Sequence, residues 1–76
     1  MNTSPEQQKL LKNLGDNIRY YRVANNWSQE QLAFECALHR TYIGAVERGE
    51  RNITVLNLSK IKNTLQVRIV DLYPEE

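Results

Sequence analysis

The fold is decided by the stretch from Ser28 to Gly49, which reads SQEQLAFECALHRTYIGAVERG. Its pattern is typical of two short helices joined by a tight turn. Ser28 can cap the first helix with its hydroxyl, and Gln31, three residues on, completes a capping box. The second helix is expected from Arg40 to Glu47, where apolar residues recur at helical spacing. Gly49 suits the left-handed residue that ends many helices.

These two helices can approach closely because the residue expected at their crossing, Ala33, is small. The turn between them is expected at residues 36–38. Ala33 then joins an apolar seam with Leu38, Ile43 and Val46. The outward face of the second helix is expected to consist of Arg40, Thr41, Gly44 and Ala45. Such a narrow face fits the major groove of B-DNA, which is about 12 Å wide.

The stretch resembles the helix-turn-helix of the phage-repressor and Cro family of transcription regulators. The resemblance is carried by Gln29, Ala33, Leu38, Ile43, Val46, Glu47 and Gly49. The run from His39 to Thr54, HRTYIGAVERGERNIT, more narrowly resembles the controller proteins of restriction–modification systems. The likeness extends over about residues 14–73. It implies an all-α, five-helix, repressor-like DNA-binding domain with the helix-turn-helix at about 28–48. The family usually has glycine where this chain has Ala37, and a left-handed alanine there costs roughly 1 kcal/mol.

Helices are also predicted on both sides of this stretch. A long helix is expected from Pro5 to Ala24, where apolar residues recur at helical spacing and Ser4 can cap the start. Gly15 inside that helix is expected to mark close packing against a neighbour. Thr54 can cap a later helix over residues 55–65. The core face of this later helix is expected to consist of Val55, Leu58, Ile61 and Leu65.

A last short helix is predicted over residues 68–73, within a dimerisation segment at about 67–73. Leu72 is expected to close the core. The remaining apolar side chains exceed what one short helix can bury in its own domain, and such a surplus suggests a homodimer surface. The alternative is that all of them belong to the core. The expected dimer surface consists of Leu56, Val67, Ile69, Val70 and Tyr73.

The resemblance also implies roles for charged and polar residues. The matching arginine and glutamate pair across the domain in such repressors, which implies a structural salt bridge between Arg22 and Glu47. The alternative is that Arg22 contacts a DNA phosphate. Base contacts are assigned to Arg40, Thr41 and Ala45, since arginine can donate two hydrogen bonds to guanine and a threonine methyl can contact thymine.

Phosphate contacts are expected around the two helix starts and in the loop that follows the second helix. Free N–H groups at a helix N-terminus favour an anion. Three of the residues have alternatives: His39 can serve as a helix cap, Tyr42 as a partly buried ring and Arg51 as a solvated charge. The full set is Ser28, Gln29, His39, Tyr42, Arg51 and Asn52.

Length and composition limit the number of domains and the kinds of function that the chain can have. The 76 residues suffice for one domain, taken as 1–76, and the net charge is only +1. Residues 28–54 hold three cations and four anions, so DNA binding would depend on placed groups and on two copies of the domain. The one cysteine excludes an intrachain disulfide and fits a reducing cytoplasm. No apolar run is long enough to cross a membrane.

These features favour a regulator over an enzyme. Cys36 and His39 lack a third orienting group, and one histidine with one cysteine cannot complete a usual zinc site. No catalytic residue, metal, cofactor or small-molecule ligand is therefore expected. The chain is interpreted as a homodimeric, sequence-specific transcription regulator on a palindromic DNA operator, with two dimers where sites adjoin. The controller resemblance implies autoregulation and control of a restriction endonuclease gene. Alternatives are a phage-type repressor, an antitoxin-like regulator, or a protein-interaction module that has lost DNA binding.

Overall fold

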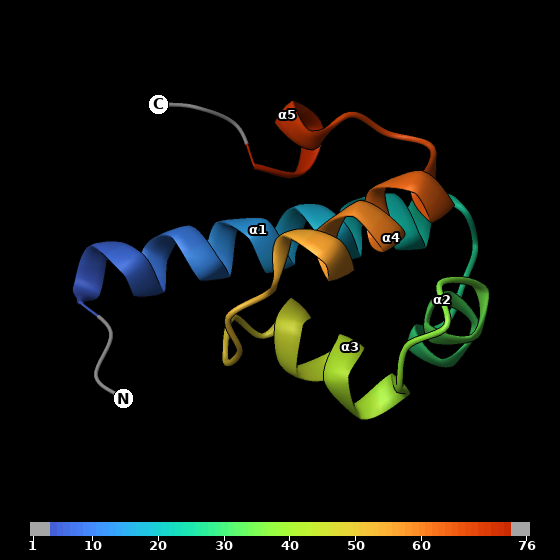
Figure 1. Ribbon diagram of the computed structural model, residues 1–76, viewed down its shortest axis with the longest axis horizontal. Coiled ribbons are helices and arrows are strands. Elements are labelled where there is room, and N and C mark those ends of the chain that lie inside the picture. Colours follow the sequence, from blue (N-terminus) through green and yellow to red (C-terminus); the bar gives the residue numbers. More distant parts are fainter. Residues whose placement is uncertain (1–3, 74–76) are drawn as a thin grey trace.

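The structure is a computed structural model, which describes residues 4–73. Five α-helices and no strand occur in this part of the chain: α1 Pro5–Ala24, α2 Gln29–Glu35, α3 Arg40–Glu47, α4 Val55–Leu65 and α5 Ile69–Leu72. In Figure 1, α1 extends along the molecule, and α5 and α3 lie on opposite sides of it. The all-α, five-helix fold predicted from the sequence is confirmed. Among these five helices, none combines the length and apolar character needed to cross a membrane.

Side-chain caps determine where the first four helices begin. Ser4 and Gln7 form a complete capping box at α1, in which each side-chain oxygen accepts from the other residue's N–H at 3.1 Å. Ser28 and Thr54 cap α2 and α4 with their hydroxyl oxygens. His39 caps α3, since its Nδ1 accepts from the Thr41 N–H at 3.0 Å. Each cap satisfies an N–H that a helix start leaves without a partner.

The capping box predicted for α2 is wrong in its second half. Ser28 Oγ accepts from the Gln31 N–H at 3.0 Å, as expected. The Gln31 side chain instead points along the helix and donates to Glu35 Oε2 at 2.7 Å. A carboxylate one turn away is a stronger acceptor partner for the Gln31 amide, because a hydrogen bond to a charged group is about twice as strong as one between neutral groups.

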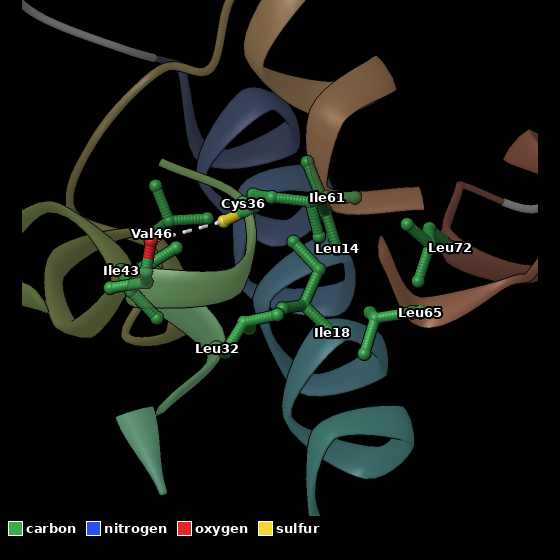
Figure 2. Close-up of a cluster of buried hydrophobic side chains, with 10 residues drawn as sticks. Leu14, Ile18, Leu32, Cys36, Ile43, Val46, Ile61, Leu65 and Leu72 are labelled. Carbon is green, nitrogen blue, oxygen red and sulfur yellow. Dashed lines mark hydrogen bonds between the residues drawn. The ribbon is translucent and has the colours of Figure 1, made fainter. Parts of the chain in front are cut away.

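One apolar cluster holds the domain together, and all five helices contribute to it. The cluster consists of Leu14, Ile18, Leu32, Ala33, Cys36, Ile43, Val46, Ile61, Leu65 and Leu72, most of which are labelled in Figure 2. Leu72 is fully buried, so it closes the core as expected. Asn17 on α1 also donates to the Leu72 carbonyl oxygen at 3.0 Å, which fastens α5 to α1 a second time.

The prediction that Val55 lies on the core face of α4 is wrong. Val55 is the first residue of α4 and its side chain is 80% exposed. Ile53, which precedes the cap, packs against the cluster instead, as does Leu58. A residue before the cap and one on the helix's next turn commonly contact each other as a hydrophobic staple. Ile53 therefore occupies the position that the periodicity alone assigns to Val55.

Two left-handed residues shape the helix-turn-helix. Ala37 in the turn has φ 58°, and the turn is closed by the Leu38 N–H, which donates to the Ala33 carbonyl oxygen at 2.8 Å. Gly49 after α3 has φ 74°, and a Cβ there would lie 2.9 Å from Lys12 Cα. The left-handed conformation of Gly49 is the one the sequence predicts, and the close approach of Lys12 gives a second reason for glycine there.

Helices α1 and α3 approach each other closely at Gly15. A Cβ at this position would lie 2.5 Å from the Glu47 carbonyl oxygen and would also overlap the Val46 carbonyl oxygen. The expectation that Gly15 marks close packing is confirmed. Because these contacts involve backbone atoms, they fix the C-terminal end of α3 against α1.

Candidate nucleic-acid interface

A buried ion pair locks α3 in place behind the candidate DNA surface. Glu47 Oε2 accepts from Arg22 Nε at 2.7 Å, and Glu47 Oε1 accepts from Arg22 Nη2 at 3.0 Å. Gln29 Nε2 adds a third hydrogen bond to Glu47 Oε1 at 3.1 Å. The side chains of Arg22 and Glu47 are 11% and 3% exposed. Arg22 Nη1 also donates to the Trp27 carbonyl oxygen at 2.8 Å, so its guanidinium is engaged inside the domain.

The outward face of α3 begins with two exposed side chains. Arg40 and Thr41 lie in its first turn, and Ala45 is half-buried one turn further on. Gly44 lines the same groove as Arg40 and Thr41, as expected for this face, but it is buried. A Cβ on Gly44 would lie 3.2 Å from Gln29 Oε1 and 3.1 Å from Arg48 Nη1, so these two side chains cover it.

Arg48 belongs to the same surface and was missed in the sequence. It follows Thr41 by seven residues and Gly44 by four, a spacing that places all three on one helix face and could have identified it. Arg48 Nε forms an exposed ion pair with Glu50 Oε2 at 3.0 Å. A shallow groove between α2 and α3 is lined by Arg22, Ser28, Gln29, Glu30, Arg40, Thr41, Gly44 and Arg48.

A second ion pair missed in the sequence crosses this groove. Arg40 Nη1 on α3 donates to Glu30 Oε2 on α2 at 2.7 Å. The two side chains are 68% and 71% exposed, so solvent reaches the pair from outside. The cation at the start of α3 is therefore held by a carboxylate of the neighbouring helix.

The two helix starts present hydrogen-bond donors beside this groove. Ser28 Oγ accepts within its cap, which leaves the hydroxyl hydrogen to donate outward. Because His39 Nδ1 accepts from Thr41, the imidazole carries its hydrogen on Nε2, which can donate. The helix-cap alternative for His39 is thus present in the structure and is compatible with a phosphate contact. The Gln29 amide nitrogen donates to Glu47, so its backbone N–H at the start of α2 is the better phosphate donor.

Tyr42 connects α3 to the loop that follows it and to α4. The Arg51 guanidinium carbon lies 5.1 Å from the centroid of the Tyr42 ring, a cation–π contact. The Tyr42 hydroxyl accepts from Asn57 Nδ2 at 3.2 Å. Tyr42 is half-buried, while Arg51 and Asn52 are exposed. The ring therefore holds Arg51 against α3 without removing its charge from solvent.

The apolar side chains expected at a dimer surface are mostly exposed on α4, on α5 and at the residue after α5. Leu56 is 75% exposed, and Ile69, Val70 and Tyr73 are 39%, 46% and 42% exposed. Val67 is half-buried and packs against the core. The alternative that all five are core residues is therefore wrong. Since α5 and α3 lie on opposite sides of α1, most of this apolar set is remote from the groove (Figure 1).

Cys36 is part of the core and not of a site. Its side chain is 5% exposed, and its Sγ lies 3.8 Å from the Ala33 carbonyl oxygen. Burial raises the pKa of the Cys36 thiol above its ordinary value. Within residues 4–73, no group of three histidine, cysteine or acidic side chains is placed to hold a metal ion.

The fold and the groove are those of a helix-turn-helix protein, and comparison with known sequences agrees. The helix-turn-helix family model matches residues 18–72, and the chain belongs to this family. The control protein C.BamHI of Bacillus amyloliquefaciens is 51% identical over 59 residues, which are 76% of this chain and 73% of that protein. The resemblance to controller proteins inferred from the sequence is confirmed.

Solved structures of controller proteins share the fold. The crystal structure of the restriction–modification controller protein C.AhdI from Aeromonas hydrophila matches with a TM-score of 0.80 and 40% identity, covering 83% of this chain and 96% of that one. The controller protein C.Esp1396I, crystallised as a tetramer with its natural 35 base-pair operator, matches with a TM-score of 0.76 and 36% identity over 84% of both chains.

Proposed function

We propose that this protein is a sequence-specific DNA-binding transcription regulator that acts as a homodimer on a palindromic operator. Its role is that of an autoregulating controller of a restriction–modification system. The observation that carries this proposal is the exposed first turn of α3, which presents Arg40 and Thr41 while Glu47 at the other end is locked to α1. The control proteins to which the chain is similar support the same role.

The recognition helix is short enough to enter the major groove as a whole. At 1.5 Å per residue, the eight residues of α3 span about 12 Å. Arg40 reads guanine through O6 and N7, Thr41 contacts a base edge or a thymine methyl, and Ala45 offers only an apolar contact. Specific reading therefore depends mainly on Arg40, with DNA deformability adding discrimination at positions that no side chain touches.

Phosphate contacts surround this helix and set its register on the duplex. Donors at the starts of α2 and α3 reach one strand, and the loop after α3 supplies further donors. Arg48 joins the set because it lines the same groove. The proposed phosphate contacts are Ser28, Gln29, His39, Tyr42, Arg51, Asn52 and Arg48.

Dimerisation places two recognition helices on one face of the DNA. The proposed interface is the apolar set Leu56, Val67, Ile69, Val70 and Tyr73. A two-fold axis through this interface brings the same patch of both protomers together. Successive major grooves on one face of B-DNA are about 34 Å apart, which sets the half-site spacing. Two dimers bind together where such sites adjoin.

We infer that this protein acts by binding and not by catalysis, in the cytoplasm, without a cofactor or small-molecule ligand. The buried Cys36 thiol and the capping role of His39 support this inference, because neither is placed to attack a substrate. Residues 4–73 form one core, which supports a single domain. Residues 1–3 and 74–76, included in the sequence-based domain 1–76, lie outside the described residues.

The test is selection of bound sequences from random duplex DNA at moderate salt. The wild-type protein should enrich an inverted repeat. Arg40→Ala should lose the preference for guanine in each half-site, whereas Arg19→Ala, which removes the same charge from an exposed position on α1, should keep it. Failure of a folded, dimeric wild-type sample to enrich any sequence would overturn the proposal.

A further inference from the structure

Glu30 on α2 holds the arginine that is proposed to read bases. The Arg40 Nη1 to Glu30 Oε2 distance of 2.7 Å equals the distance from Arg22 Nε to Glu47 in the buried pair. The two residues are ten positions apart and belong to different helices, so the contact crosses the groove. A mobile surface arginine thereby acquires a fixed partner on the face that meets DNA.

We propose that Glu30 determines the sequence specificity of this protein by positioning Arg40, an inference that rests on the function proposed above. A guanidinium carries five N–H donors in one plane. Glu30 engages Nη1, and among residues 4–73 the edge formed by Nε and Nη2 has no hydrogen-bond partner. That edge can donate two parallel hydrogen bonds to guanine O6 and N7. The carboxylate thus leaves free the two donors that guanine requires.

The same carboxylate makes Arg40 selective. An arginine without a fixed partner can turn to any phosphate within reach, which strengthens binding to every sequence alike. Here a phosphate approaching Nη1 meets the negative charge of Glu30 and is repelled. Guanine is uncharged and presents its acceptors to the opposite edge, so it is not penalised. Glu30 therefore lowers binding to wrong sequences more than binding to the right one.

The test compares affinities of full-length variants for the selected operator and for a scrambled duplex, by fluorescence anisotropy over a range of salt concentrations. Glu30→Gln removes the charge, and Glu30→Asp keeps it but shortens the side chain by one methylene. Glu35→Gln is the matched control, because it removes the same charge from the same helix and the Glu35 carboxylate contacts only the neutral Gln31 among the described residues.

Glu30→Gln should lower the ratio of specific to non-specific affinity by about fivefold or more, since one well-placed bidentate contact discriminates at least that strongly. Its non-specific salt dependence should steepen by about one phosphate contact as Arg40 turns to the backbone. Glu30→Asp should lower the ratio without this steepening. Glu35→Gln should leave both quantities at the wild-type value, and Glu30→Gln should change nothing further in an Arg40→Ala background.

A ratio for Glu30→Gln within twofold of wild type overturns the inference, and so does an equal loss in Glu35→Gln, which would mean a general charge effect. Neither result contradicts the proposed function, because the wild-type protein still prefers its operator. Absence of any preference in the wild type overturns the proposed function, and it is visible before any substitution is made. Equal melting temperatures of the three glutamate variants and wild type would confirm that the change acts at the DNA surface and not through the fold.

Discussion

Replacement of Arg22 by methionine should remove a large part of the domain's free energy of unfolding. Glu47 accepts two hydrogen bonds from Arg22 and one from Gln29, and its side chain is only 3% exposed. Arg22→Met keeps an unbranched chain of similar volume but leaves the buried carboxylate with Gln29 alone. Breaking a buried pair in this way costs about 3–5 kcal/mol.

That loss is large for a chain of this size. Domains have roughly 0.05–0.15 kcal/mol of stability per residue, which gives about 4–11 kcal/mol here. Each kcal/mol shifts the melting temperature of such a domain by about 4–8 °C. Arg22→Met should therefore lower the melting temperature by roughly 12 °C or more. Arg22→Met/Glu47→Leu should recover most of the loss, because an apolar pair carries no desolvation cost.

The assays are urea unfolding, for the free energy, and thermal melting, both followed by circular dichroism at one fixed protein concentration because a dimer's apparent stability depends on concentration. Lys12→Met is the matched control: Lys12 and Asp16 are also 2.7 Å apart, but their side chains are 58% and 52% exposed. Lys12→Met should lower the free energy of unfolding by less than about 0.5 kcal/mol. If Arg22→Met costs no more than Lys12→Met, or the double variant is as unstable as the single one, burial is not what gives the pair its importance.

Three further perturbations test the packing and the turn. Gly15→Ala should lower the free energy of unfolding by about 1–3 kcal/mol, measured by urea unfolding, because the new methyl overlaps the α3 backbone; an unchanged value would show that α1 and α3 separate freely. Ala37→Gly should raise the free energy of unfolding by up to roughly 1 kcal/mol, since φ is 58° and the residue is exposed; a loss of stability would refute the strain. Burial raises the pKa of the Cys36 thiol in the folded state only. The free energy of unfolding should therefore keep the thiol's full contribution below pH 9.0, the ordinary thiol pKa, and fall as the pH rises above it. Cys36→Ala should flatten that part of the stability–pH curve, and an unaltered curve would assign the decline to other groups.

Local signals in the sequence located the helices because a cap and its partner lie within three residues. Ser4, Ser28 and Thr54 each begin a helix where the pattern predicts one. The same locality explains the failure at Val55. Periodicity extends the core face back to the helix start, but it contains no information on which side of the cap the chain turns toward the core.

Side-chain ion pairs between helices could be predicted only where the family resemblance supplied them. The Arg22–Glu47 pair joins residues 25 positions apart, and composition or spacing alone does not select it. Glu30 and Arg40 have several alternative charged partners nearby in the sequence, so their pair depends on the crossing of α2 and α3. The burial of Gly44 has the same origin, because Gln29 reaches it from the other helix. Arg48 alone could have been found from spacing on its own helix.

The two ends of α3 are constrained very differently. At its C-terminal end, Gly15 contacts the backbone and Glu47 is bonded to α1, so nearly any substitution there disturbs folding. At its N-terminal end, Arg40 and Thr41 are exposed, Arg40 is hydrogen-bonded to Glu30, and the Thr41 N–H donates to the His39 cap. Mutation can therefore vary the residues proposed to read bases while the scaffold remains unchanged. This separation allows related chains to diverge toward new operators without passing through unfolded intermediates, and it marks positions 30, 40 and 41 as the natural set for directed evolution of altered specificity.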